Sequence, residues 1–410
     1  MRAILAGFEE AGQLHSFHTT LSFRQSDWLV RFAPEPLKND LLRRSFDIPP
    51  ERCVLHPGRE LVRLGSARLG LSFLTGGKEG WASIDAIYTD LDRQVGDYLR
   101  ACFADRTATP GTLRTPEAVY CYEDSALKTF QAATELGLKR YYDLPIAYWE
   151  TVHRLLLQEA ERLPRWEPTL GATSDPPQKL ARKCDEISLS DVVICPSHFV
   201  LDSLPDTIRK EKTCLVSEFG SPQASAIPER AQESGLAAAK LRVLFAGSLS
   251  QRKGLADVFQ AIQILKRKDV ELIVLGSLIM PLDFYRKECP SFTYEPPRPH
   301  DEVLNLMSTC DILVLPSIVE GRALVQQEAM MCGLPLIVTP NAGGCDLIEE
   351  GETGFLVPVA SPEVIAEKIS WFADHPGRLA SMRQKTRKKA EALTWQDYAR
   401  KILNTCLSRQ

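Results

Sequence analysis

Two glutamates mark the stretch "PSIVEGRALVQQEAMMCGLPLIVTPNAGG", residues 316–344, as a place where chemistry could occur. The apolar run before it is typical of a buried strand, so Glu320 falls in a loop at the carboxyl end of that strand. A short helix is expected to begin near Arg322 and to end at Gly333. A carboxylate in such a loop is placed to meet a ligand, because open parallel sheets bind ligands outside the carboxyl ends of their strands.

Glu328 lies within that predicted helix, on a stripe of otherwise apolar positions. A carboxylate on a mostly buried face needs hydrogen bonds or a charged partner, because leaving it bare is costly. The hydroxyl pair of a ribose is one way to satisfy it. The alternative is that Glu328 pairs within the protein and Glu320 is a solvated loop residue, which is the commoner situation for two isolated glutamates. The stripe comprises Leu324, Val325, Glu328, Ala329 and Cys332.

The start of the same helix suits a phosphate group. The first N–H groups of a helix have no partner inside it, and the helix dipole adds partial positive charge there. The amides of Gly321, Arg322 and Ala323 are therefore candidate phosphate donors.

The elements that must position these residues form two regions of alternating strands and helices. In the first region, helical stretches alternate with the apolar runs "AVYCY", "RYYDL", "DVVICPS" and "TCLVSEF". The second region repeats the pattern from "VLFAGS" to "GFLVPV". Because 410 residues exceed what one core usually serves, we expect an α/β protein of two facing doubly wound domains with a cleft between them.

The segment "EFGSPQASAIPERAQESGLAAAKL" has neither a helical nor a strand period and separates the two regions. The predicted units are a first domain at residues 1–217, a linker at 218–240, and a second domain at 241–385. Residues 386–410 are expected to include a helix that returns to the first domain. The beginning is ambiguous, because "MRAILAGF" fits a strand and "AILAGFEEAGQLHSF" fits an amphipathic helix.

Bulk composition narrows the partners and the compartment. A net charge of −4 gives no electrostatic case for nucleic acid. The basic run "RQKTRKKAEA" is interpreted as a solvated helix face, with an anionic membrane surface as the alternative. Eleven cysteines without paired spacing indicate free thiols and no zinc site. Because no leader or spanning segment is evident either, we expect a cytoplasmic protein.

These motifs resemble the retaining glycosyltransferases of family 4 (glycosyl transferases group 1), which have the GT-B architecture. The resemblance rests on "EGRALVQQEAMMCGLP" followed by "NAGGCDLIEEGETGFLV", and on the first loop of the second domain, "FAGSLSQRKG". It is specific over residues 241–375. In the first half it is weaker and depends on "CPSHFVLDSL" and the order of elements.

The resemblance implies a role for each matching residue. Glu320 would meet the hydroxyls of the transferred sugar, and Glu328 would hold the ribose of a nucleotide donor. Lys253 and Arg252 would neutralise the diphosphate, because charge develops on the leaving phosphate oxygen. The remaining donor-binding candidates are Gly247, Ser248, the backbone of Gly321, Arg322, Ala323 and Leu324, and, near the nucleobase, Tyr294 and Glu295.

Three departures from the family pattern concern the site. Ser248 stands where many members have arginine, which leaves the diphosphate more dependent on Lys253 and Arg252. Pro145 aligns with a histidine of the first domain, and Asp143 is the nearest polar substitute, although a turn or cap role fits it equally well. If residues 3–21 correspond to the first helix of the family and the residues after it, the first strand and its glycine loop are absent.

The sequence therefore predicts an enzyme that moves a sugar from a UDP- or GDP-sugar to a glycan, lipid or small-molecule acceptor, with retention implied by resemblance alone. No cofactor is expected, because the nucleotide sugar is a substrate; a peripheral membrane contact is compatible with this function. His56 and His198 are further acceptor-side candidates, although isolated histidines are more often structural. The alternatives are a non-catalytic nucleotide-sugar-binding protein and a nucleotide-sugar epimerase of the same fold.

Overall fold

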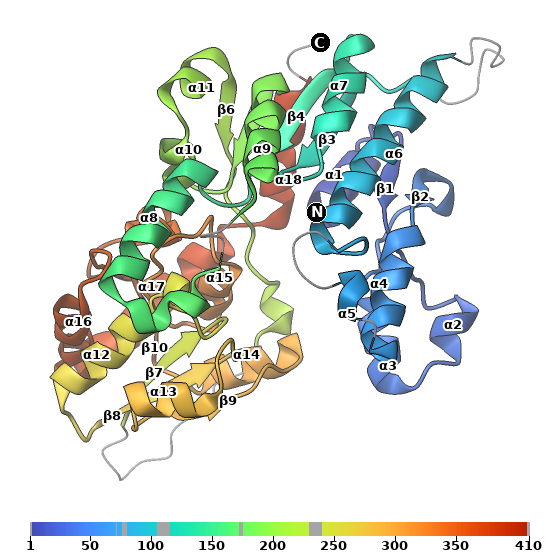
Figure 1. Cartoon of the computed structure of the whole chain (residues 1–410). Coiled ribbons are helices and arrows are strands. Elements are labelled where there is room, and N and C mark those ends of the chain that lie inside the picture. The colour runs from blue at the N-terminus through green and yellow to red at the C-terminus, as the bar shows by residue number, and fades with distance from the viewer. Residues whose placement is uncertain are drawn as a thin grey trace.

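The fold is described from a computed structural model of the chain (Figure 1). Two α/β halves lie side by side, with the N-terminal half in blue and green and the C-terminal half in yellow to red. The chain crosses between them more than once. The structure describes residues 2–70, 72–75, 80–104, 115–171, 175–228 and 240–407.

The N-terminal half contains two parallel sheets. The larger has the strand order β3–β4–β5–β6, and the smaller pairs β1 with β2. The strands are β1 (Phe17–Thr19), β2 (Cys53–Leu55), β3 (Ala118–Tyr122), β4 (Lys139–Asp143), β5 (Val192–Cys195) and β6 (Thr213–Val216). The helices are α1 (Arg2–Glu10), α2 (Trp28–Arg31), α3 (Glu35–Leu42), α4 (Gly58–Leu69), α5 (Ser72–Thr75), α6 (Ile84–Ala104), α7 (Leu127–Glu135), α8 (Trp149–Arg162), α9 (Pro177–Leu189), α10 (His198–Ser203) and α11 (Asp206–Glu211).

The first element is a helix, which resolves the ambiguity at the beginning of the chain. Ile4 of α1 packs with Tyr141 and Ile194 of the larger sheet, whereas Leu5 packs with Phe17 of the smaller one. Apolar residues at adjacent helix positions thus bridge the two sheets.

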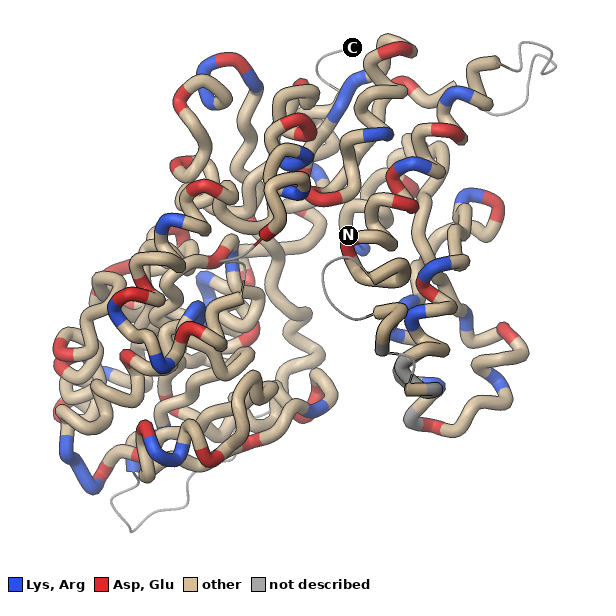
Figure 2. The backbone as a smooth tube through the Cα atoms, in the orientation of Figure 1, with Lys and Arg blue, Asp and Glu red and all other residues tan. Residues whose placement is uncertain are grey.

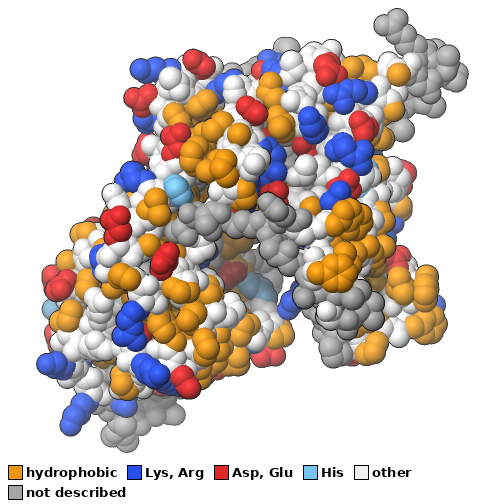
Figure 3. Space-filling model, viewed as in Figure 1, with side chains coloured by type: hydrophobic (Ala, Val, Ile, Leu, Met, Phe, Trp, Pro, Cys, Tyr) orange, Lys and Arg blue, Asp and Glu red, His pale blue; other side chains and the backbone are white. Residues whose placement is uncertain are grey.

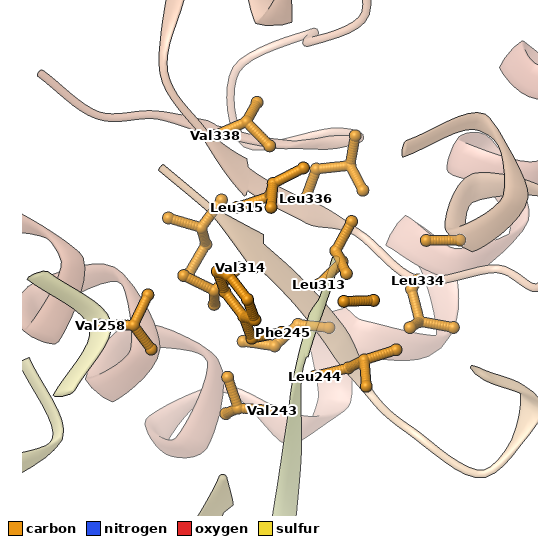
Figure 4. Packing of buried hydrophobic residues seen from close by; sticks show 14 of the residues in the cluster. Val243, Leu244, Phe245, Val258, Leu313, Val314, Leu315, Leu334, Leu336 and Val338 are labelled. Atoms are coloured by element: carbon orange, nitrogen blue, oxygen red, sulfur yellow. The ribbon is translucent and has the colours of Figure 1, made fainter. Parts of the chain in front are cut away.

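The C-terminal half is one six-stranded parallel sheet with the order β12–β11–β10–β7–β8–β9. Its central strands are buried throughout, because helices cover them, and their side chains interlock as Figure 4 shows. The strands are β7 (Leu241–Ala246), β8 (Val270–Leu275), β9 (Thr293–Glu295), β10 (Ile312–Leu315), β11 (Leu336–Val338) and β12 (Gly354–Leu356). The helices are α12 (Leu255–Leu265), α13 (Leu282–Glu288), α14 (His300–Ser308), α15 (Leu324–Met331), α16 (Pro362–Asp374) and α17 (Pro376–Glu391), followed by α18 (Trp395–Leu407).

The C-terminal crossing lies later than predicted. Helix α17 packs against α15 of the C-terminal half, so the boundary at residue 385 is wrong. Helix α18 does lie on the N-terminal half, where Tyr398 and Ile402 pack with Tyr141. The two crossings touch, since the amide of Ser221 donates to the carbonyl of Leu393 at 2.8 Å. Residues 229–239 of the predicted linker and 408–410 of the last segment lie outside the described residues.

A segment from the N-terminal half of the sequence belongs structurally to the C-terminal half. After α8, the 3-10 helix η2 (Pro164–Thr169) places Trp166, only 2% exposed, in the C-terminal core. Its ring meets Phe259, Phe284 and Tyr285 edge to face. The domain of residues 1–217 is therefore not a continuous packing unit.

Candidate active site

The loops after β7 and β10 bring together three charged residues on which the predicted chemistry depends. Lys253 Nζ donates to Glu320 Oε2, and Arg252 Nη1 donates to the same oxygen at 3.0 Å. The side chains of Lys253 and Glu320 are 12% and 14% exposed, so their pair is largely removed from water. Two cations share one carboxylate, which leaves one formal positive charge in excess.

Burial and charge oppose each other at this cluster. Burial alone would raise the pKa of Glu320, but Lys253 and Arg252 outweigh it and hold that pKa below its usual range. Burial also lowers the pKa of Lys253, an effect that Glu320 only partly offsets. The cluster therefore favours an ionised Glu320, and a second anion would find a cation that is not fully neutralised.

Close backbone contacts fix the two loops. The amide of Ile318 donates to the carbonyl of Arg252 at 2.9 Å. Gly254, which follows the 3-10 helix η4 (Gln251–Lys253), has a φ of 79°, and a Cβ there would overlap the carbonyl oxygen of Pro316. The glycine after Lys253 is required because only glycine combines this backbone conformation with this close approach.

The rest of the first donor loop lies beside the lysine. A Cβ at Gly247 would come within 3.7 Å of the Cε of Lys253. Ser248 Oγ lies 3.4 Å from Ser250 Oγ and contributes no charge. These positions border the ion-pair cluster from the β7 side.

Glu328 lies on the less buried face of α15, which corrects the predicted stripe. Leu324 on that stripe is 42% exposed, whereas Gln326 and Gln327 are fully buried. Their amide groups donate to carbonyls of neighbouring loops, so two glutamines occupy the inward face where apolar residues were expected. The pattern misled because hydrogen-bonded glutamines can be buried as fully as apolar side chains.

Glu328 has a histidine as a titratable neighbour. Its Oε1 lies 3.6 Å from Nδ1 of His300, the first residue of α14. Burial raises the pKa of Glu328, and His300 only partly opposes this. Such a carboxylate is suited to accept hydrogen bonds from ligand hydroxyls.

The predicted nucleobase residues lie at the end of β9. Tyr294 donates its hydroxyl proton to the carbonyl of Gly276 at 3.1 Å, and the Gly276 amide donates to the carbonyl of Glu295 at 3.0 Å. The Glu295 carboxylate pairs with Arg298. Both residues hold the loop after β8 in place, and neither side chain is directed by these contacts to a ligand.

The start of α15 offers fewer phosphate donors than predicted. The helix begins at Leu324, two residues later than expected. The Gly321 amide hydrogen-bonds the Glu320 carboxylate, and a Cβ on Gly321 would overlap the carbonyl oxygen of Pro145. The amides of Ala323 and Leu324 are the better placed candidates, because they directly precede and open the helix.

The side chain of Arg322 makes a contact between the two halves, which leaves the predicted role of its backbone amide open. Its side chain is fully buried and donates to the carbonyl of Pro196 and to Asp346, both at 3.3 Å. Asp346 also accepts from the backbone amide of His198 and lies 2.6 Å from its Nδ1. Ser197 Oγ donates to the Gly321 carbonyl at 2.7 Å. His198 is thus part of a contact between the halves, and the motif "CPSHF" carried no signal for it beyond its place at a strand end.

Asp143 does not present its carboxylate to the cleft. It is 2% exposed and accepts a hydrogen bond from the hydroxyl of Tyr120 at 2.5 Å. Burial raises the pKa of Asp143 to about 6, although hydrogen bonds from Tyr120 and Tyr122 lower it. Its assignment as an acceptor-side residue is wrong for this conformation.

His56 belongs to a chain of polar groups beside β1 and β2. Its Nε2 lies 3.0 Å from Nδ1 of His18, and its Nδ1 lies 2.8 Å from Oε1 of Gln94. Nε2 of His18 in turn lies 3.1 Å from Oγ of Ser16. Burial and the neighbouring histidines lower the pKa of His18 to about 4. Within the described ranges, no group of three or more His, Cys, Asp and Glu side chains is placed to hold a metal ion.

Comparison with solved structures defines the class of fold. The chain is similar to sucrose-phosphate synthase from Thermosynechococcus elongatus, with 18% identity, 82% of each chain covered and a TM-score of 0.58. It is also similar to Anabaena Alr3699/HepE in complex with UDP, with 16% identity, 77% of this chain and 82% of that chain covered, and a TM-score of 0.56. Two facing Rossmann-like domains of this kind are the GT-B fold, as predicted.

Comparison of sequences shows a family similarity in the C-terminal half. Residues 227–391 match the family model described as "Glycosyl transferases group 1". A D-inositol 3-phosphate glycosyltransferase of Arthrobacter sp. (strain FB24) is 28% identical over 180 residues, 41% of this chain and 43% of that protein. The putative colanic acid biosynthesis glycosyltransferase WcaL of Escherichia coli (strain K12) is 25% identical over 186 residues, 41% of this chain and 44% of that protein. The similarity to this family is thus confined to the C-terminal half, and the chain spans less than half the length of these relatives.

Proposed function

We propose that this protein is a glycosyltransferase that moves a sugar from a nucleotide-sugar donor to an acceptor with retention of configuration. The observation that carries the proposal is the cluster of Lys253, Arg252 and Glu320 at the carboxyl ends of β7 and β10. A diphosphate is the kind of ligand that two cations sharing one carboxylate would bind, because it supplies the missing negative charge. UDP is the favoured nucleotide, since the structurally similar Anabaena protein was crystallised with UDP and with UDP-glucose.

In this proposal each residue has a distinct task. Without donor, Glu320 neutralises part of the charge of Lys253 and Arg252. When the diphosphate binds, the cations turn to it and stabilise the charge that builds on the leaving oxygen, and Glu320 becomes free to hold hydroxyls of the sugar. Glu328, on the outer face of α15, accepts hydrogen bonds from the ribose hydroxyls.

The first experiment measures binding. Thermal shift and calorimetry with UDP, GDP and their sugars would compare the wild type with Glu328→Ala and with Glu363→Ala, an exposed glutamate on α16. We expect one nucleotide to raise Tm, since a ligand that binds only the folded state stabilises it. Glu328→Ala should weaken its affinity about 10-fold or more, the loss typical of charged hydrogen bonds, and Glu363→Ala should not. Equal affinities in all three proteins would contradict the donor site.

The second experiment separates catalysis from binding. Lys253→Ala should weaken donor binding, whereas Glu320→Gln should lower kcat about 10²-fold or more, as loss of a transition-state contact does, with a smaller effect on binding. Mass detection of transferred or released sugar measures this. The alternative of a non-catalytic binder is favoured by Pro145, whose carbonyl packs against Gly321 and which stands where the family resemblance implies a histidine. Donor binding without any sugar release or transfer across an acceptor panel would support that alternative.

A further inference from the structure

The segment between β1 and α6, residues 21–84, displays an unusual amount of apolar surface. Every large hydrophobic side chain that is more than half exposed among the described residues lies in this segment, here called the apical lobe. Figure 3 shows hydrophobic side chains gathered on this lobe, at the lower right. They are Trp28 (70%), Phe32 (78%), Leu61 (53%), Phe73 (73%), Trp81 (51%) and Ile84 (60%).

Helix α2 holds two of these aromatic residues outward. Val30 is 1% exposed and anchors the helix, while Trp28 and Phe32, four residues apart, lie on a common side of it. The carboxylate of Asp27 accepts from the amide of Arg24 at 2.7 Å and fixes the approach to the helix. The two rings are therefore displayed by an ordered turn.

A second group lies where α5 meets the segment before α6. The amide of Ala82 donates to the carbonyl of Leu74 at 2.9 Å, which joins the neighbourhoods of Phe73 and Trp81. The guanidinium of Arg59 lies 4.8 Å from the centre of the Trp81 ring and donates to the Trp81 carbonyl at 2.6 Å. An aromatic ring beside an arginine combines an apolar body with a cation, as membrane-interface residues do.

The charge of the apical lobe differs from that of the rest of the chain. Residues 21–84 contain ten Lys and Arg against seven Asp and Glu, a net charge of +3, whereas the whole chain has −4. Arg31 stands between Trp28 and Phe32, is exposed, and forms no ion pair with a described residue. Exposed aromatics with interspersed arginines complement an anionic, amphipathic surface.

The basic run near the C-terminus does not offer such a surface. Lys385 pairs with Glu352, and Lys389 pairs with Glu349 at 2.7 Å. Along the tube in Figure 2, acidic and basic residues are interspersed in this half. The membrane alternative considered for α17 is thus less suitable than the apical lobe, where aromatic side chains accompany the cations.

We propose that the apical lobe docks the protein on an anionic lipid bilayer. Trp28, Phe32, Phe73 and Trp81 enter the headgroup boundary, and Arg31 meets lipid phosphates. Arg59 is held by the Trp81 carbonyl and by Asp90 and orients the Trp81 ring. A lipid surface fits better than a folded protein partner, because these side chains project from separate short elements interleaved with arginines. Docking requires neither donor binding nor sugar transfer. No described helix is long and apolar enough to cross a membrane.

Sedimentation with vesicles tests this proposal. The full-length protein would be mixed with vesicles of phosphatidylcholine alone and with vesicles containing one third phosphatidylglycerol. The variants are Trp28→Ser/Phe32→Ser, Arg31→Glu, and the control Ile264→Ser, a half-exposed residue of α12. Wild type and control should sediment with the anionic vesicles, and the double variant should bind at least about 10-fold more weakly, since two large apolar side chains no longer enter the lipid. Arg31→Glu should bind anionic vesicles more weakly than the wild type does. This difference should be larger at low salt than at high salt, because salt screens the attraction between the arginine and the lipid.

Two outcomes would overturn the proposal. One is equal sedimentation of the double variant and the wild type. The other is an absence of vesicle binding together with a concentration-dependent dimer that Trp28→Ser/Phe32→Ser abolishes, which would make the lobe an interface between copies of the chain. All three variants should retain the wild-type Tm, because the replaced side chains are exposed, and a matching Tm would show that each variant is folded.

Discussion

The charged cluster shows why a carboxylate occupies the end of β10. Lys253 and Arg252 both pair with the same oxygen of Glu320. Without Glu320 the two cations would repel each other strongly, because the site is largely shielded from water. Glu320 stabilises this arrangement by pairing with both cations, and under the proposed function a bound diphosphate would take its place.

Asp143 leads to a prediction about pH. Its folded pKa of about 6 lies above the ordinary value of 3.8, so the folded state binds a proton more tightly than the unfolded state does. The contribution of this group to stability is present below about pH 4 and is lost as pH rises through 6, at a cost of about 3 kcal/mol by linkage. Asp143→Asn keeps an acceptor for Tyr120 and removes the ionisation. Its free energy of unfolding, relative to the wild type, should therefore rise between pH 4 and pH 7 in urea titrations.

The control for this experiment is Ile264→Ser, a half-exposed change on α12 that removes no ionisable group. Its difference from the wild type should stay constant over the same pH range. A constant difference for Asp143→Asn as well would show that the ionised carboxylate is not penalised inside the sheet.

At the scale of elements, the loops after β4 and β10 touch at Gly321. Because a Cβ there would overlap the carbonyl oxygen of Pro145, Gly321→Ala should push the two loops apart and destabilise the protein by about 1–3 kcal/mol, as overpacking does. The contact between Ser197 and the Gly321 carbonyl should weaken with it. Thermal or chemical denaturation measures the loss.

Gly377→Ala is the matched control, since nothing lies within 4 Å of the Cβ it would add on α17. It should leave Tm unchanged or raise it slightly, because alanine favours a helix over glycine. If Gly321→Ala were equally harmless, the halves would be shown to separate at this contact in solution.

At the scale of the whole molecule, α8 and η2 connect the two halves, because they come from the first half of the sequence and pack on the C-terminal half. Arg162 of α8 donates to Asp257 at 2.8 Å and also pairs with Glu159 of its own helix, and Gln251 Nε2 donates to Glu159 at 2.6 Å. With Trp166 in the C-terminal core, this segment should move with the C-terminal half during any closure of the cleft. The hinges then lie at the ends of the segment as well as at the two crossings.

Trp166→Ala should therefore destabilise the C-terminal half, although the residue comes from the first half of the sequence. The expected loss is about 3–5 kcal/mol, typical of removing a buried tryptophan. Relative to the wild type, hydrogen exchange should show a larger loss of protection in β7, β8 and α12 than in β3 and β4. Leu157→Ala, a partly exposed change on α8, is the control and should affect neither sheet. Equal losses of protection in both halves would contradict this assignment.

The sequence alone determined the class of fold and the identity of the charged cluster. Parallel strands between helices produce long apolar runs with a legible period, and "FAGSLSQRKG" and "EGRALVQQE" each combine a strand end, a glycine and charged residues within a few positions. The family resemblance assigned Lys253, Arg252 and Glu320 to one site, and they do meet because their loops follow neighbouring strands of one sheet.

Only the tertiary structure decided which remote residues come into contact. Arg322, Gly321 and His198 serve the contact between the halves, Asp143 is enclosed by tyrosines, and Trp166 fills the core of the other half. These partners lie tens to hundreds of positions away in the chain, and local periodicity carries no information about such distances. Burial, and with it the pKa of a carboxylate, depends on the side chains that arrive from remote elements, so it is a property of the assembled molecule.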